Sequence, residues 1–282
     1  MFDGDNRHTT LITHAVSTRV NKPKVLILHA NGTNRDRDAL LACELAGGDP
    51  EIVHVTQLMN QERGLLDYHM LIVPGGFSYG DDLGAGVLWA QDLRRKLGVD
   101  LQKFIDNGRP VLGICNGFQT LVKAGVLPDA DWSPDVRAAH TDRAITLTYN
   151  QKGKFECRWV YLKPVTNSPC LFTEGITEPI HCPVAHGEGR VVATNDVVLQ
   201  QLINDGLAPL IYVDAQGKPA GYPVNPNGSS YNIAGLCNPM GNVFGLMPHP
   251  ENHVFPWQHP RFRRGEQGMD GLRLFKNGIK FA

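Results

Sequence analysis

VLGICNGFQT, residues 111–120, joins a short apolar run to a cysteine that has a glycine two residues away on either side. The apolar run predicts a buried strand, and the spacing G-x-C-x-G matches a thiol version of the G-x-S-x-G elbow, a strained strand-to-helix turn that requires small neighbours. Such a turn projects the Cys115 thiol from the carboxyl end of a sheet, lets a helix N-terminus stabilise the thiolate and directs the Asn116 N–H toward an oxyanion. A buried structural cysteine in an ordinary glycine turn is the alternative, because cysteine is among the most buried residue types.

The segment MPHPE, residues 247–251, offers the partner that a thiol nucleophile needs. An imidazole takes the proton of the thiol and returns it to a leaving amine, and a carboxylate fixes the tautomer of that imidazole. His249 and Glu251 are two residues apart, so their side chains point the same way in an extended segment, and the flanking prolines stiffen the backbone. The alternative is a surface turn with a solvated histidine and glutamate.

Two glycine-rich segments complete the candidate chemistry: PGGFSYGDD at residues 74–82 and AHGEGR at residues 185–190. The glycine pair of the first segment follows a predicted buried strand, and its exposed N–H groups can donate to an oxyanion opposite Asn116. A glycine-rich hairpin is the alternative there, and the G-x-x-x-x-G-K-[ST] pattern of a phosphate loop is absent. The glycines of the second segment suggest backbone close to a ligand, although alone it is only a polar turn.

The order of the predicted elements indicates an α/β fold. Strands are expected at 24–28, 52–55, 69–73 and 111–114, and helices at 35–45 with Asn34 as a candidate N-cap, at 85–105 and at 119–124. This alternation is typical of an open parallel sheet with helices on its faces, whose ligands bind at the carboxyl ends of the strands. From residue 143 onward, short alternating runs predict antiparallel strands, with a hairpin around Gln216–Lys218. We therefore predict an N-terminal arm, residues 1–22, and one domain, residues 23–282, with an open mixed, mainly parallel sheet flanked by helices.

Composition and charge limit the possible partners and the compartment. The 282 residues carry a formal net charge of −1, so the chain has no basic field that would attract nucleic acid or a membrane surface. No window approaches the roughly 18 consecutive apolar residues of a membrane span, and the polar start lacks a secretory pattern. Six cysteines without a C-x-x-C pair favour reduced thiols. We expect a cytoplasmic protein that binds neither nucleic acid nor a membrane.

A metal site is a weaker possibility near the same histidine. His249-Pro250-Glu251-Asn252-His253 superficially matches H-E-x-x-H, but the glutamate is at the wrong position and Pro250 disfavours the required helix. His181 and Cys182 lack a matching second pair of ligands. We expect no metal in this chain.

The segments PGGFSYGDD, GICNGFQ, AHGEGR and FGLMPHPE together resemble the class I (triad-type) glutamine amidotransferases, a family with a flavodoxin-like fold. GICNGFQ and GGFSYGD resemble in particular the PurQ-type glutaminase subunits of phosphoribosylformylglycinamidine synthase. The resemblance runs from about Lys24 to the end of the chain. It departs at HANGTNRDRD, residues 29–38, where such subunits often read close to P-G-S-N-C-D-R-E. The missing cysteine leaves the triad untouched but puts an interface or loop role of that segment in doubt.

The resemblance implies a role for each catalytic residue. Cys115 would attack the side-chain amide of glutamine and form a thioester while ammonia is released. His249 would act as general base and acid, and Glu251 would orient it. The backbone N–H groups of Gly76 and Asn116 would form the oxyanion hole.

The resemblance also implies how the substrate and partners bind. Gln119 and the backbone around His186, Gly187 and Glu188 would hold the amino-acid head of glutamine. Ammonia would pass to a PurL-type synthetase subunit, which makes formylglycinamidine ribonucleotide from formylglycinamide ribonucleotide with ATP in purine biosynthesis. A small PurS-type subunit completes the assembly in many bacteria and archaea. No cofactor is expected in this chain, since ATP and Mg belong to the partner synthetase.

Two functional alternatives remain from the residues. One is a free-standing cysteine hydrolase of the same fold, a γ-glutamyl hydrolase or peptidase relative, which needs no synthetase. The other is a non-catalytic subunit, which the presence of nucleophile, base and carboxylate disfavours. The basic tail after Asn252 is either a solvated surface or a docking surface for an acidic partner.

Overall fold

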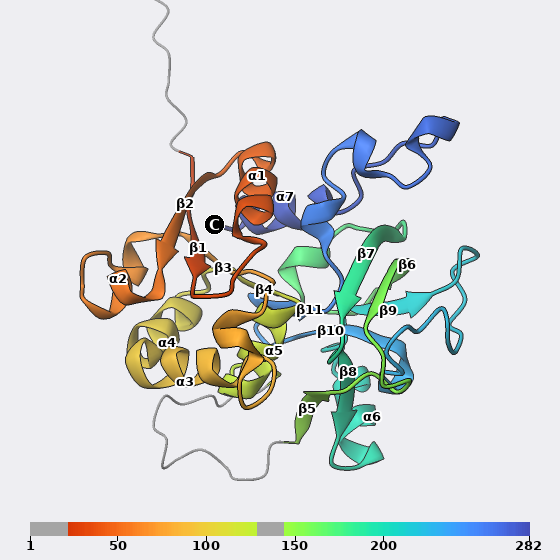
Figure 1. Cartoon of the computed structure of the whole chain (residues 1–282), viewed down its shortest axis with the longest axis horizontal. Coiled ribbons are helices and arrows are strands. Elements are labelled where there is room, and N and C mark those ends of the chain that lie inside the picture. The colour runs from red at the N-terminus through yellow and green to blue at the C-terminus, as the bar shows by residue number, and fades with distance from the viewer. Residues whose placement is uncertain (1–21, 129–143) are drawn as a thin grey trace, which may run out of the picture.

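The computed structural model describes residues 22–128 and 144–282, and within these ranges nine strands form one sheet (Figure 1). The eleven strands of these ranges are β1 Lys24–His29, β2 Asp49–His54, β3 Met70–Val73, β4 Val111–Ile114, β5 Ile145–Thr148, β6 Glu156–Pro164, β7 Ile180–His186, β8 Arg190–Ala193, β9 Leu210–Val213, β10 Ile233–Cys237 and β11 Val243–Leu246. The order in the large sheet is β2-β1-β3-β4-β11-β10-β9-β6-β7, and β5 pairs with β8 in a small separate sheet. Only β10 and β6 run against the other strands of the large sheet. The predicted mixed, mainly parallel sheet is confirmed.

The three central strands β3, β4 and β11 pair in parallel, and all of their residues are buried. Continuous apolar strands of this kind require cover on both faces of the sheet. Their carboxyl ends meet at one edge, the place where open α/β sheets bind ligands. This edge brings together the segments that follow the three strands, at residues 74–82, 115–119 and 247–251.

Helices cover both faces of the sheet (Figure 1). They are α1 Asp36–Ala46, α2 Val55–Met59, α3 Val87–Lys96, α4 Gly98–Asp106, α5 Asn116–Ala124, α6 Asp196–Asn204 and α7 Leu272–Lys280. On one face α1 and α7 lie side by side, and a Cβ on Gly278 of α7 would lie 2.6 Å from Cε of Met70 in β3. On the other face α5 packs so closely on β11 that a Cβ on Gly245 would lie 2.2 Å from the Phe118 ring.

The structure corrects the predicted helix boundaries. The helix expected at 85–105 is two helices, α3 and α4, which meet at Leu97 and Gly98, where glycine is a poor helix former. Asn34 does not cap α1: the N-cap residue is Arg35, which makes no side-chain capping bond. The Asn34 N–H instead donates to the carbonyl of Gly75, so a contact with the segment after β3 replaces the expected local cap.

The hairpin predicted around residues 216–218 is also wrong. Asp214 and Lys218 close a turn, with the Asp214 N–H 2.9 Å from the Lys218 carbonyl oxygen. Among the described residues no strand follows this turn directly: the next strand, β10, begins only at Ile233 and pairs antiparallel with β9 from there. The physical reason is that β10 and β6 already occupy both edges of β9.

The structure bears in different ways on the expected N-terminal arm and on membrane-spanning helices. The proposed arm at residues 1–22 lies outside the described residues except for Lys22. No helix in the described part of the chain is long and apolar enough to cross a membrane.

Candidate active site

Cys115 lies in a strained turn between β4 and α5. Its backbone has φ 50° and ψ −105°, and a positive φ is uncommon for a residue other than glycine. The Cys115 N–H donates to the Leu246 carbonyl at 2.8 Å, and the Cys115 carbonyl accepts from the Gln119 N–H at 3.0 Å, so bonds on both sides hold the strained residue. Its sulfur lies 3.7 Å from the carbonyl oxygen of Ala185 in β7. The predicted elbow is therefore present, and the sulfur faces the strand that leads into AHGEGR.

The two glycines of the elbow are required by close packing. A Cβ on Gly117 would lie 1.8 Å from the Val73 carbonyl oxygen, at the end of β3. A Cβ on Gly113 would lie 2.6 Å from the Leu121 side chain and 2.9 Å from the Gly117 carbonyl oxygen. Real Cβ atoms do not tolerate such distances, so the G-x-C-x-G spacing lets α5 start directly against β3 and β4.

His249 and Glu251 follow β11, with Glu251 in the short 3₁₀-helix Pro250–Asn252. The His249 Nδ1 lies 2.6 Å from Oε1 of Glu251, and the His249 N–H donates to the Pro183 carbonyl at 2.8 Å. Both side chains are buried, so the alternative of a solvated surface turn is wrong. With Nδ1 held by the carboxylate, Nε2 is the nitrogen that can exchange protons, and it has no hydrogen-bond partner among the described residues.

The imidazole of His249 and the side chain of Cys115 both lie close to Gly75. A Cβ on Gly75 would lie 2.9 Å from Cε1 of His249 and 3.5 Å from Cβ of Cys115, so the two side chains flank this glycine. Burial alone would lower the pKa of His249, but the negative charges of Glu251 and of the Cys115 thiolate outweigh burial and raise the pKa to about 10. The structure thus brings Cys115, His249 and Glu251 together as one electrostatically coupled set.

The two predicted oxyanion donors lie after β3 and at the start of α5. Gly76 has φ 153°, and a Cβ there would lie 2.8 Å from both Cα of Thr33 and N of Asn34. Only glycine fits this position. Asn116 is the first residue of α5, so its N–H has no acceptor within the helix and remains available.

The four residues predicted to hold the amino-acid head lie next to the elbow. The Gln119 Nε2 donates a short hydrogen bond to the Glu188 carbonyl, and Gln119 Oε1 accepts from Asn116 Nδ2 at 3.1 Å. Burial and the charge of His249 lower the pKa of His186 to about 3, so this imidazole is neutral at pH 7. The Gly187 carbonyl accepts a hydrogen bond from the backbone N–H of Asn150 at 2.9 Å. Gln119 and the loop after β7 therefore form one wall of the site.

Asn150 organises that wall and was missed by the sequence reasoning. Its Nδ2 donates to the His186 carbonyl at 2.8 Å, and its backbone N–H is the donor to Gly187. Its Oδ1 accepts from the Gly189 N–H at 3.1 Å and lies 3.1 Å from Nδ1 of His186. Asn150 ends a segment of ordinary strand composition, and no local signal distinguishes it.

Asp81 is a second residue that the sequence reasoning missed. It has φ 55°, is partly buried, and its Oδ1 accepts from Asn116 Nδ2 at 3.1 Å. Burial first, and then the nearby Glu188 carboxylate, raise the pKa of Asp81. Asp81 belongs to the quoted segment PGGFSYGDD, but nothing in the sequence separates it from Asp82.

The histidines considered as metal ligands have other contacts. His253 Nδ1 lies 2.5 Å from the His181 carbonyl oxygen, and both rings pack against Trp159. In the ranges that the structure describes, no group of three or more His, Cys, Asp or Glu side chains could hold a metal ion.

Comparison with known proteins agrees with this geometry. A model of the CobB/CobQ-like glutamine amidotransferase domain matches residues 22–282, and the chain therefore belongs to this family of glutamine amidotransferases. Its relatives include the phosphoribosylformylglycinamidine synthase subunit PurQ of Treponema denticola, 46% identical over 272 residues that cover 93% of this chain and 99% of the relative. The PurQ subunit of Dehalococcoides mccartyi is 43% identical over 267 residues, with 93% and 99% covered.

A solved structure agrees with these relatives. A chain in the structure of PurLQS from Thermotoga maritima superposes with a TM-score of 0.68 at 34% identity, covering 92% of this chain and 99% of that chain. The family resemblance predicted from the four motifs is confirmed.

Proposed function

We propose that this chain is the glutaminase subunit of a phosphoribosylformylglycinamidine synthase. It hydrolyses L-glutamine to glutamate and ammonia, and a partner synthetase uses the ammonia with ATP to convert formylglycinamide ribonucleotide to formylglycinamidine ribonucleotide in purine biosynthesis. The observation that carries the proposal is the strained Cys115 elbow, which faces the buried pair His249 and Glu251.

In the first half of the reaction, the Cys115 thiolate attacks the side-chain carbonyl carbon of glutamine. The carbonyl oxygen becomes an oxyanion and accepts hydrogen bonds from the N–H groups of Gly76 and Asn116. When the tetrahedral intermediate collapses, the C–N bond breaks and His249 Nε2 donates a proton to the departing ammonia. A thioester between Cys115 and the glutamyl group remains.

In the second half, water hydrolyses the thioester. His249, now neutral, takes a proton from the water as it attacks the thioester carbonyl, and the same two backbone N–H groups stabilise the second oxyanion. Glutamate leaves and the Cys115 thiolate is restored beside the His249 imidazolium. Glu251 keeps Nδ1 protonated throughout, so Nε2 alone exchanges protons.

The wall formed by Gln119 and the loop after β7 fits the amino-acid head of glutamine. We assign this head to Gln119 and to the backbone of His186, Gly187 and Glu188. The carboxylates of Asp81 and Glu188 add negative charge that suits the α-ammonium group, as the effect of the Glu188 charge on the pKa of Asp81 indicates.

The partners follow from the relatives. The PurLQS structure supports a PurL-type synthetase subunit, and we propose a PurS-type small subunit as the third component. ATP and Mg are assigned to the synthetase, because the chemistry of this site needs only a thiolate, an imidazole and backbone donors.

The test measures ammonia release from glutamine by this chain alone and with a PurL-type synthetase, a PurS-type subunit, ATP and formylglycinamide ribonucleotide. We expect weak activity alone and a large increase in the complex. Cys115→Ala should abolish synthesis from glutamine and leave synthesis from added ammonium chloride intact. Full activity without any partner would instead support the free-standing hydrolase.

A further inference from the structure

The loop at residues 30–35, between β1 and α1, contacts the backbone of the proposed oxyanion hole. Thr33 and Gly76 lie opposite each other in an isolated antiparallel bridge. Two hydrogen bonds, one on either side of the pair, form the bridge. The Phe77 N–H donates to the Gly32 carbonyl at 3.0 Å, and the Asn34 N–H donates to the Gly75 carbonyl at 3.4 Å. In such a pair, the N–H groups of the two facing residues point away from each other. The loop therefore turns the Gly76 N–H away from itself.

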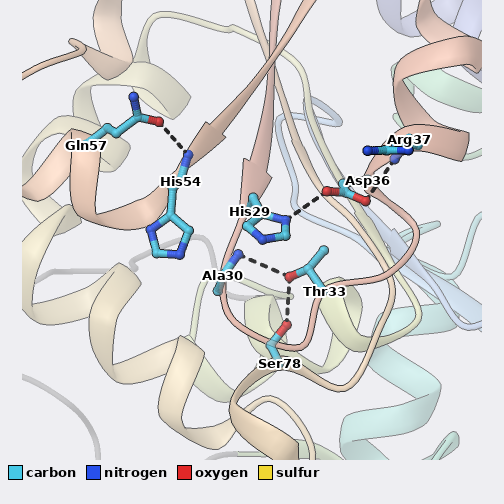
Figure 2. A network of polar contacts seen from close by, with 8 residues as sticks. All are labelled: His29, Ala30, Thr33, Asp36, Arg37, His54, Gln57 and Ser78. Atoms are coloured by element: carbon cyan, nitrogen blue, oxygen red, sulfur yellow. Dashed lines mark hydrogen bonds and ion pairs between the residues drawn. The ribbon is translucent and has the colours of Figure 1, made fainter.

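The side chain of Thr33 holds the loop in this conformation (Figure 2). Its Oγ1 accepts from the Ala30 N–H at 3.1 Å, while its own N–H donates to the Ala30 carbonyl at 3.0 Å. The same Oγ1 lies 3.2 Å from Oγ of Ser78, so one of the two hydroxyls donates to the other. Thr33 and Ser78 are both buried, so water cannot replace these bonds at low cost.

Ser78 extends the network to the second proposed donor. Its backbone N–H donates to Oδ1 of Asn116 at 3.2 Å. One buried hydroxyl, that of Thr33, is thereby linked to Gly76 through the bridge and to Asn116 through Ser78. No other described contact of the loop at residues 30–35 reaches both donors.

We propose that Thr33 is a positioning residue of the oxyanion hole, which acts through Gly76 and Asn116 without touching substrate. The inference rests on the proposed function, because it assigns the two N–H groups to an oxyanion. It also gives a role to the HANGTN segment, residues 29–34. The role lies in the bridge and the hydroxyl network, and neither needs a cysteine.

The test compares Thr33→Val with Thr33→Ser in the full chain, assayed in complex with its synthetase. Thr33→Val keeps the shape but leaves the Ala30 N–H and the Ser78 hydroxyl without their partner. Complete loss of one oxyanion donor costs about 10²- to 10³-fold in kcat. We expect a misplaced donor to cost roughly 10- to 100-fold in kcat, with KM changed less than about twofold. Thr33→Ser should restore most of the rate.

A second readout separates oxyanion positioning from general damage to the site. Iodoacetamide alkylates Cys115 by displacement: the thiolate forms the S–C bond, iodide leaves, and no oxyanion develops. The alkylation rate, followed by mass spectrometry of the Cys115 peptide, should be the same in Thr33→Val and in the unmodified chain. Thr173→Val is the matched control. Like Thr33, Thr173 is buried and its hydroxyl is hydrogen-bonded to the backbone, here donating to the Cys170 carbonyl oxygen at 3.2 Å.

Three results would overturn the inference: unchanged turnover in Thr33→Val, a parallel fall of turnover and alkylation, or a Thr33→Ser rate as low as that of Thr33→Val. If Thr33→Val fails to fold, Ser78→Ala removes the other hydroxyl and takes the same two readouts. A slow turnover with normal alkylation then supports the inference, and normal turnover refutes it. Persistence of turnover in Cys115→Ala would instead refute the proposed function itself.

Discussion

Nδ1 of His249 lies 2.6 Å from Oε1 of Glu251, and both side chains are buried. Burial opposes a charged imidazole, so the raised pKa of about 10 depends on the neighbouring negative charges. Glu251→Gln keeps the shape and removes one of these charges. We expect the pKa of His249 to fall and kcat to fall by about 10²- to 10⁴-fold, as in other triads that lose their carboxylate.

The pKa is measured by following the His249 ring resonance by NMR as pH is varied. Glu266→Gln is the matched control, because Glu266 lies 4.0 Å from another histidine, His259. An unchanged His249 titration in Glu251→Gln, or an equal shift in both variants, would contradict the proposed coupling.

The raised pKa of His249 also predicts how stability depends on pH. The folded chain holds the His249 proton up to about pH 10, whereas an unfolded chain releases it near 6.5. The stabilisation from this proton is therefore complete below pH 6.5 and is lost as pH rises toward 10. Urea unfolding between pH 6.5 and 10 should show a steeper loss of free energy of unfolding in the unmodified chain than in Glu251→Gln. If the free energy of unfolding fell with pH equally in both proteins, the raised pKa of His249 would not contribute to stability.

Packing at the elbow predicts a severe effect of Gly117→Ala. The added Cβ would lie 1.8 Å from the Val73 carbonyl oxygen, so α5 must move away from β3. We expect a loss of about 1–3 kcal/mol or more in the free energy of unfolding, together with a fall in kcat. Gly221→Ala is the control, because a Cβ there meets no atom within 4 Å. Equal stability of the two variants in thermal unfolding would show that the elbow tolerates a displaced helix.

Asp81 offers a test of substrate binding. Asp81→Asn keeps an acceptor for Asn116 but removes a charge, so the KM for glutamine should rise by about 10- to 100-fold with little change in kcat. Because the pKa of Asp81 is raised, its charge at neutral pH destabilises the folded chain, and Asp81→Asn should unfold at an equal or higher temperature. Asp82→Asn, at an exposed neighbouring position, should change neither the KM for glutamine nor the unfolding temperature. A fall in kcat at constant KM would argue against an ammonium site.

Local signals made much of the fold predictable. The apolar runs of β1, β3 and β4 and the glycine spacing around Cys115 depend on adjacent residues, and the structure has them where they were expected. The failures depend on distant contacts. The turn at Asp214–Lys218 forms no hairpin because β10 and β6 occupy the edges of β9, and Asn34 bonds to Gly75 instead of capping α1.

The same division applies to the candidate site. Cys115, His249 and Glu251 are unusual residue types in tight motifs, so the sequence alone could nominate them. Asn150 and Thr33 are ordinary polar residues, and their roles arise from hydrogen bonds to residues 36 and 45 positions away. The spacing of residues along the sequence does not indicate such long-range hydrogen bonds.

The identity of the nucleophile is the central claim, and covalent labelling tests it most directly. The chain is incubated with the diazoketone analogue of glutamine, 6-diazo-5-oxo-L-norleucine, and the modified peptide is identified by mass spectrometry. Cys157 is exposed and serves as an internal control for non-specific alkylation. We predict stoichiometric modification of Cys115 that excess glutamine prevents. Modification of Cys43, Cys157, Cys170, Cys182 or Cys237 with Cys115 untouched would contradict the mechanism.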